Sequence, residues 1–353
     1  MIQINRYFML SKHRIYPFIL LLALSACSSG DENTAAPLRI QVFTGAYSSI
    51  PVHVADELGL FQKYGLSIEK LPANSSSAAL AAMIGGSIDI VESAADLVMA
   101  NIDKGTKLKY LMSNEGTNYV SVVAGSHVQL DSEDIEYPNI ISNFKGLRIG
   151  VNAIGSSLHL TGLLMLEEAG LTSDDVEFVA TGSAATTMSA WRAGAVDIQI
   201  TFSPVPELLD TLDAGRTLFV LADEGPSTLR FQGLYGGWVT TNKFLESDSD
   251  RADAFIKAMR ESIDWIRNPD NETKMLEIAT QHAPVSGLTE DQNRSVLANM
   301  IEHYRRFWGY EISNDAIEMW NDYALRFDLI KNRIAFEDIV YTGAPVCAAT
   351  PCQ

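Results

Sequence analysis

The sequence predicts an α/β protein built from two similar lobes. Strand-like and helix-like segments alternate from residue 38 to about residue 245, the pattern typical of βαβ units. One plan, a helix followed by a glycine and then by an aspartate inside a short apolar strand, occurs twice, at residues 78–93 and 186–202. The chain has 353 residues and 47% hydrophobic content, which is ample for a hydrophobic core and suggests two lobes.

The first half of the chain predicts a mainly parallel sheet flanked by helices. Apolar residues alternate with polar ones in the expected strands, and the helix after Ser75 ends at a pair of glycines. We expect strands at residues 38–43, 66–71, 88–93, 107–114 and 119–126, and helices at residues 51–61, 75–86 and 96–105.

An acidic insert at residues 131–136 precedes a second unit of the same kind. We expect strands at residues 147–152, 176–181, 196–202 and 235–244, and helices at residues 157–169 and 183–194. Three further helices follow at residues 251–268, 291–309 and 314–330, where apolar residues recur every three to four positions. The simplest packing returns these last helices to the first lobe, which makes that lobe discontinuous.

The first residues resemble a bacterial lipoprotein signal. Arg6, Lys12 and Arg14 precede an apolar run too short to span a bilayer, and small residues lead to Cys27. The resemblance implies a signal peptide at residues 1–26, an acyl chain such as palmitate on Cys27, and a flexible tether at residues 27–37. It implies an extracytoplasmic protein anchored by lipid to a bacterial membrane, and leaves inner and outer membrane open. The alternative is an ordinary N-terminal helix with a chance cysteine.

The charge excludes some partners. The net charge is −18, and removal of residues 1–26, which hold three basic and no acidic side chains, makes it −21. Nucleic acids and anionic lipid surfaces need Lys/Arg patches, so we expect neither as a partner. Cys347 and Cys352 form a small terminal disulfide or remain two free thiols; an exported protein favours the disulfide. No Cys/His spacing typical of a metal site occurs.

Four segments together resemble the substrate-binding proteins of ABC importers, in particular the nitrate, sulfonate and taurine group with its thiamine-pyrimidine relatives. They are residues 51–71, 81–96, 144–160 and 191–204. The resemblance implies the type II periplasmic-binding-protein fold, with lobe I at residues 38–122 and 234–345, lobe II at residues 123–233 and a tail at residues 346–353. Two strands cross between the lobes near residues 119–124 and 221–237. The resemblance also implies a monomer that docks on a membrane permease and ATPase, with no enzymatic activity and no cofactor.

Loops that follow strands predict the ligand site, because α/β sheets bind ligands beyond the carboxyl ends of their strands. The candidates are Gly45, Tyr47, Ser48, Ser93, Gly155, Ser156, Ser157, Gly182, Thr201, Phe202, Ser203 and Tyr235. For Ser156 and Ser157 the alternative role is capping of the helix that begins there. Glu92 is either solvated or a counter-charge for a cationic ligand.

These loops contain hydroxyls and aromatic rings but almost no Lys or Arg. Hydroxyls and helix ends alone bind too weakly, so burial of an organic body must contribute. A sulfonate, a taurine-like solute or an uncharged pyrimidine fits. The resembled family often has an aromatic-Asp-Pro turn where this chain has Ser203, which argues against an amine-bearing ligand. Two other functions stay open: a sensory lipoprotein, and an enzyme of pyrimidine synthesis on the same fold.

Overall fold

The computed structural model describes residues 36–73, 75–130, 136–182, 184–285, 287–348 and 352. The predicted signal peptide and the lipidation site Cys27 lie outside these residues. The elements of the first unit are β1 (Leu38–Phe43), α1 (Ile50–Glu57), α2 (Leu60–Lys63), β2 (Ile68–Ala73), α3 (Ser76–Ile84), β3 (Val91–Ala94), α4 (Ala95–Asp103) and β4 (Leu108–Glu115). Ser75 caps α3, as its sequence position predicts, by accepting a hydrogen bond from the Ala78 amide at 3.2 Å.

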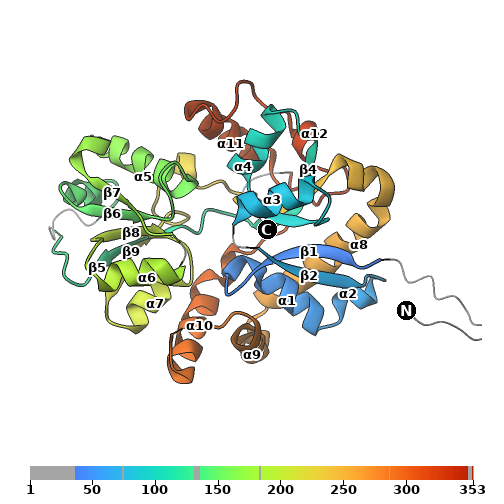
Figure 1. The fold of residues 1–353 in the computed structure, drawn as a ribbon, viewed down its shortest axis with the longest axis horizontal. Helices are drawn as coiled ribbons and strands as arrows, with labels where there is room; N and C mark the ends of the chain where they lie inside the picture. The colour runs from blue at the N-terminus through green and yellow to red at the C-terminus, as the bar shows by residue number, and fades with distance from the viewer. Residues whose placement is uncertain are drawn as a thin grey trace, which may run out of the picture. The chain divides into compact units, whose positions relative to one another are not determined.

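The second unit repeats the plan around a five-stranded sheet. Its elements are β5 (Ser121–Gly125), β6 (Arg148–Val151), α5 (Ser157–Glu168), β7 (Glu177–Ala180), α6 (Ala184–Arg192), β8 (Ile198–Thr201), α7 (Val205–Thr211) and β9 (Gly215–Val220). The strand order is β7-β6-β8-β5-β9, and helices flank the sheet (Figure 1).

The chain then returns through β10 (Gly236–Thr241) to the first unit. The helices that follow are α8 (Asn242–Arg267), α9 (Glu272–His282), α10 (Glu290–Tyr304), α11 (Asn314–Arg326) and α12 (Phe336–Ile339). Short 3-10 helices occur at Tyr47–Ser49 (η1), Asn139–Phe144 (η2), Ser173–Asp175 (η3), Ser227–Leu229 (η4), Pro269–Asn271 (η5) and Arg305–Phe307 (η6).

The sheets are more mixed than the expected mainly parallel ones. The pairs β1-β2, β6-β7 and β6-β8 are parallel, whereas β10 is antiparallel to β3 and β4, and β5 is antiparallel to β8 and β9. Strand β5 is the first strand after the chain passes from one sheet to the other through residues 116–120. Strand β10 is the first strand after it passes back through residues 221–235. A strand that enters from the other unit is not the product of a right-handed βαβ crossover, so nothing requires it to be parallel.

The C-terminal helices do not all pack on the first unit alone, as the simplest packing predicts. Helix α8 contacts α1 and α2, but α10 contacts α7 as well as α9. Val296 on α10 joins a hydrophobic cluster with Val205 and Leu209 of α7. The buried side chains of α10 form one face, and this face packs against α7 and α9 together, which places the last turn of α10 beside the connections between the sheets.

Cys347 and Cys352 are joined by a disulfide, with their Cα atoms 5.5 Å apart. The bridge closes a short loop at the C-terminus. Among the described residues, no helix has both the length and the apolar character required to cross a bilayer.

Candidate functional site

Six aromatic side chains gather where the two units meet, and we call them the aromatic cluster. They are Tyr47, Tyr119, Phe202, Tyr235, Tyr304 and Trp308. The Tyr47 ring stacks on Trp308 with centroids 4.0 Å apart and lies 5.1 Å from the Tyr119 ring. Phe202, which follows β8, lies 5.2 Å from Tyr119. Three of the predicted site residues, Tyr47, Phe202 and Tyr235, are thus brought together from three distant loops.

Each ring is positioned by the element that carries it. Tyr47 lies in η1, directly after β1, and its hydroxyl donates to the Tyr304 backbone carbonyl at 2.6 Å. Tyr119 lies in one connection between the sheets and Tyr235 at the end of the other, and their rings are 5.6 Å apart. Tyr304 ends α10, and its hydroxyl shares a 2.5 Å hydrogen bond with Ser121 Oγ at the start of β5. The cluster therefore joins both units and both connections.

Two buried glutamates face each other beside this cluster. Strand β10 runs between β3 and β4, so Gly236 separates Glu92 from Glu115. A Cβ atom on Gly236 would lie 2.8 Å from Glu115 Oε2 and 2.8 Å from Glu92 Oε1, so any larger residue there would force the carboxylates to move. Glu115 Oε1 accepts from Asn114 Nδ2 at 2.7 Å, and the predicted site residue Ser48 hydrogen-bonds Glu92.

The environment of this pair raises the pKa of both carboxyl groups. Burial raises the pKa of Glu92 to about 7, and the Ser48 hydrogen bond opposes that rise. Burial, together with the charge of Glu92, raises the pKa of Glu115 well above its usual range. Glu92 is only 8% exposed, so the interpretation of it as a solvated side chain is wrong: its strand is covered by β10.

The two serines at the start of α5 have different roles. Ser156 is the N-cap residue, and its hydroxyl accepts a hydrogen bond from the His159 amide at 3.4 Å. Ser157 instead donates its hydroxyl to Asp96 Oδ2 at the start of α4, in the other unit. Asp96 is buried, and that burial raises its pKa. Capping therefore explains Ser156, whereas Ser157 links the two units.

The remaining predicted residues lie near the cluster or point elsewhere. The Ser93 hydroxyl donates to the Ala94 carbonyl at 3.3 Å, and the Thr201 hydroxyl to the Phe202 carbonyl at 3.5 Å, so both are used locally. Gly45, Gly155 and Gly182 have positive φ and serve as turns. Gly155 and Gly182 are exposed and contribute no side chain to the cluster.

Ser203 has a partner one helical turn later, on α7. Its hydroxyl donates to Glu207 Oε2 at 2.9 Å, and Glu207 is only 3% exposed. The other carboxylate oxygen, Oε1, is buried and has no hydrogen-bond partner. Burial raises the pKa of Glu207 to about 7, and Ser203 opposes that rise.

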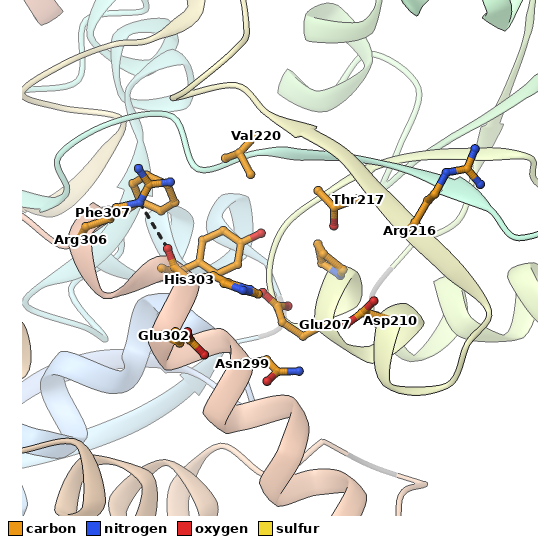
Figure 2. Close-up of a pocket in the computed structure, with 12 residues that line it drawn as sticks. Glu207, Asp210, Arg216, Thr217, Val220, Asn299, Glu302, His303, Arg306 and Phe307 are labelled. Carbon is orange, nitrogen blue, oxygen red and sulfur yellow. Dashed lines mark hydrogen bonds between the residues drawn. The ribbon is translucent and has the colours of Figure 1, made fainter. Parts of the chain in front are cut away.

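Glu207 lines a cavity of about 580 Å³ between α7, β9 and the end of α10 (Figure 2). Thr217 and Val220 come from β9, and Tyr304 and Phe307 form an aromatic wall. The volume is in the range of small-molecule sites, which is roughly 300–1,000 Å³. Tyr304 belongs to both the cavity and the aromatic cluster, so the two adjoin.

The site is rich in buried acids. Among the described residues no Lys or Arg is buried, and Glu92, Asp96, Glu115 and Glu207 form no ion pair within that part of the chain. The basic residues that line the cavity are occupied or exposed. Arg306 pairs with Asp223 at 2.5 Å, Arg216 donates to the Val128 carbonyl at 3.4 Å, and His303 is exposed.

Sequence reasoning missed several of these residues. Asp96, Glu115, Tyr119, Glu207, Tyr304 and Trp308 were not candidates. A weak signal exists for Glu207, which lies four residues after Ser203 and therefore on the same face if a helix begins between them. Nothing local marks Tyr304 or Trp308, because only the packing of α10 brings them to the site.

A family model described as NMT1/THI5 like matches residues 47–272, more than half of the chain. No curated protein matches the chain by sequence. Solved structures share its fold. The periplasmic aliphatic sulphonate binding protein SsuA from Escherichia coli is 16% identical with a TM-score of 0.70, over 90% of this chain and 96% of that one.

Two further structures extend the likeness. The alkanesulfonate-binding protein SsuA from Xanthomonas axonopodis pv. citri, bound to MOPS, is 19% identical with a TM-score of 0.66, over 87% of this chain and 99% of that one. The periplasmic nitrate-binding protein NrtA from Synechocystis PCC 6803 is 13% identical with a TM-score of 0.58, over 73% and 69%. The fold is that of the periplasmic binding proteins, and the chain belongs to the NMT1/THI5-like family.

Proposed function

We propose that the protein is an extracytoplasmic solute-binding protein that captures a small organic solute between its two lobes and delivers it to the permease and ATPase of an ABC importer. The observation that carries the proposal is the aromatic cluster. It draws side chains from both units and both connections, and it adjoins a cavity of ligand size. A site built from both halves is the arrangement that allows a ligand to hold two lobes together.

The family and the fold support the same proposal. The neighbours named above bind sulfonates or nitrate, and their names place several of them in the periplasm. We extend to this chain the predicted lipid anchor at Cys27, the monomeric state and the flexible tether. The lobe boundaries at residues 122, 233 and 345 belong to the same proposal.

In this proposal the protein releases the solute chemically unchanged. The Ser157 and Ser203 hydroxyls donate to carboxylates, and the Ser156 hydroxyl caps a helix. None of these contacts supplies the imidazole base that activates a serine nucleophile in a triad. The geometry supports binding and release.

Of the expected solutes, a pyrimidine-like ring suits the site better than a sulfonate or taurine-like group. An aromatic ring has aromatic partners in Tyr304 and Phe307, which line the cavity beside the cluster. A sulfonate would need desolvated positive charge, and no Lys or Arg is buried among the residues that the structure describes.

A solute panel tests this function. The panel contains a pyrimidine, an amine, a sulfonate, taurine, nitrate and bicarbonate. We expect at least one of them to raise the melting temperature of the protein, since a ligand at a hundred times its Kd adds about 2.7 kcal/mol to the free energy of unfolding. Phe202→Ala should weaken binding of the hit about tenfold or more. Phe336→Ala is the matched control, because Phe336 is also partly buried but lies on α12, outside the cluster.

Mass spectrometry of the recovered solute completes the test. The account predicts that the hit is recovered intact after long incubation with the protein. A chemically altered solute would point to an enzyme. A panel without any stabilising solute, or equal losses for Phe202→Ala and Phe336→Ala, would contradict the proposed site.

A further inference from the structure

We propose that the solute carries a positively charged nitrogen and that Glu207 receives it in the cavity between α7, β9 and α10. This inference rests on the proposed function and adds the charge class of the solute. It reverses the expectation that Ser203, in place of the aspartate of the resembled family, argues against an amine-bearing ligand. The carboxylate that is absent at Ser203 is supplied one helical turn later by Glu207.

The first support is the hydrogen bonding of Glu207. Ser203 occupies Oε2 at 2.9 Å, whereas Oε1 is buried without a donor. A buried carboxylate oxygen without a donor destabilises the protein, and native structures rarely leave one. Glu207 also lines the cavity, and a rotation of its carboxylate would bring Oε1 from its buried position to a donor there. Figure 2 shows Glu207 on α7 facing the last turn of α10.

The second support is the sign of the surrounding charge. Asp210 lines the same cavity and adds to the negative potential at Glu207. Glu115 and Glu207 both act electrostatically on Tyr47, so buried acids flank the aromatic cluster from two sides. Of the two arginines on the wall, Arg306 is already paired with Asp223, and Arg216 is exposed. A cationic nitrogen would compensate this excess of negative charge, whereas a neutral donor would not.

The third support is the aromatic wall. Tyr304 and Phe307 line the cavity, and Tyr304 continues into the cluster through its 5.8 Å contact with Tyr47. Aromatic faces attract cations, and the attraction strengthens when water is excluded. The expected ligand class is therefore an aromatic or apolar body with a protonated amine or amidine. A bare inorganic anion fits neither the volume nor the charge.

Three probes of similar size and different charge test the inference: benzylammonium, benzyl alcohol and benzenesulfonate. Binding to the intact mature protein is followed by NMR and calorimetry up to about 100 mM, so that even weak fragment binding is measured. We expect the wild-type protein to bind benzylammonium at least about tenfold more tightly than either other probe.

Glu207→Gln should abolish this preference, with a loss of roughly 10- to 100-fold for benzylammonium and less than about threefold for benzyl alcohol. Glu177→Gln removes the same charge from exposed β7, at the opposite edge of the sheet from β9, and should leave all three affinities unchanged. A melting temperature of Glu207→Gln within a few degrees of the wild type at pH 5 shows that the variant is folded.

The outcomes separate this inference from the proposed function. Stronger binding of benzenesulfonate, equal binding of all three probes, or a cation preference that survives Glu207→Gln overturns the inference while solute binding itself stands. Absence of benzylammonium binding up to about 100 mM also overturns it. The proposed function falls as well if the solute panel described above finds no ligand, or if the recovered solute is chemically altered.

Discussion

Four acidic side chains are buried at or beside the candidate site. Glu92, Asp96, Glu115 and Glu207 are buried without basic partners among the described residues. Burial disfavours their charged forms, so the pKa of each is raised. Such groups destabilise the empty protein when ionised, and a ligand of opposite charge removes that penalty.

This leads to a pH prediction for Glu207. Its pKa rises from 4.5 to about 7 on folding, so the folded state keeps its proton where the unfolded state has lost it. The resulting stability is full below pH 4.5 and is lost as pH rises toward 7, on the order of 1 kcal/mol per pH unit.

Urea unfolding at pH 5 and pH 8 checks the prediction. Glu207→Gln should lose less stability than the wild type between these two values, and Glu177→Gln should follow the wild type. Parallel changes in all three proteins would show that Glu207 does not titrate in this range.

At the scale of elements, the two serines at the start of α5 allow a role in helix capping to be tested separately from a role in solute binding. Ser156 caps the helix, and Ser157 reaches Asp96 in the other unit. We expect Ser156→Ala to lower the free energy of unfolding by about 1 kcal/mol and to leave solute affinity unchanged. Ser157→Ala should weaken solute binding, because the closed arrangement loses a contact between the units.

Calorimetry of the two variants with the solute found in the panel measures the difference. The double-alanine variant should combine both effects. If Ser156→Ala weakens binding as strongly as Ser157→Ala, then the cap also contacts the ligand. Equal affinities for the wild type and Ser157→Ala would remove the role given to the contact with Asp96.

Elements were predictable where the pattern is local. The strands at residues 38–43 and 147–152 and the helices at residues 75–86 and 157–169 follow from alternation, serine caps and glycine stops, and the structure places β1, β6, α3 and α5 within these ranges. Helix α7 was missed, because Pro204 and Pro206 conceal a helix that begins at Val205. With α7 unrecognised, the relation between Ser203 and Glu207 was hidden too.

Pairings between distant strands could not be predicted. Glu92 and Glu115 meet because β10, more than 100 residues later, inserts between β3 and β4. No local pattern in β3 or β4 shows that insertion. The aromatic cluster has the same origin, since Tyr304 and Trp308 depend on where α10 packs. The rule that ligands bind in loops after strands selected Tyr47 and Phe202, which lie in the aromatic cluster, but it did not select Glu115 or Glu207.

At the scale of the whole molecule, the two connections at residues 116–120 and 221–235 join the sheets of the two units, and one hydrophobic cluster continues through both. Tyr119 and Tyr235 lie at these connections, with their ring centroids 5.6 Å apart. A ligand at the aromatic cluster would therefore contact the two connections as well as both lobes. Binding there should shift the population toward a closed form.

Small-angle X-ray scattering of the mature protein, with and without the solute found in the panel, tests most directly whether solute binding closes the two lobes. The account predicts a smaller radius of gyration at saturating solute for the wild type, and a reduced change for Ser157→Ala. A solute that binds tightly while the radius of gyration of the wild type stays constant would contradict the account.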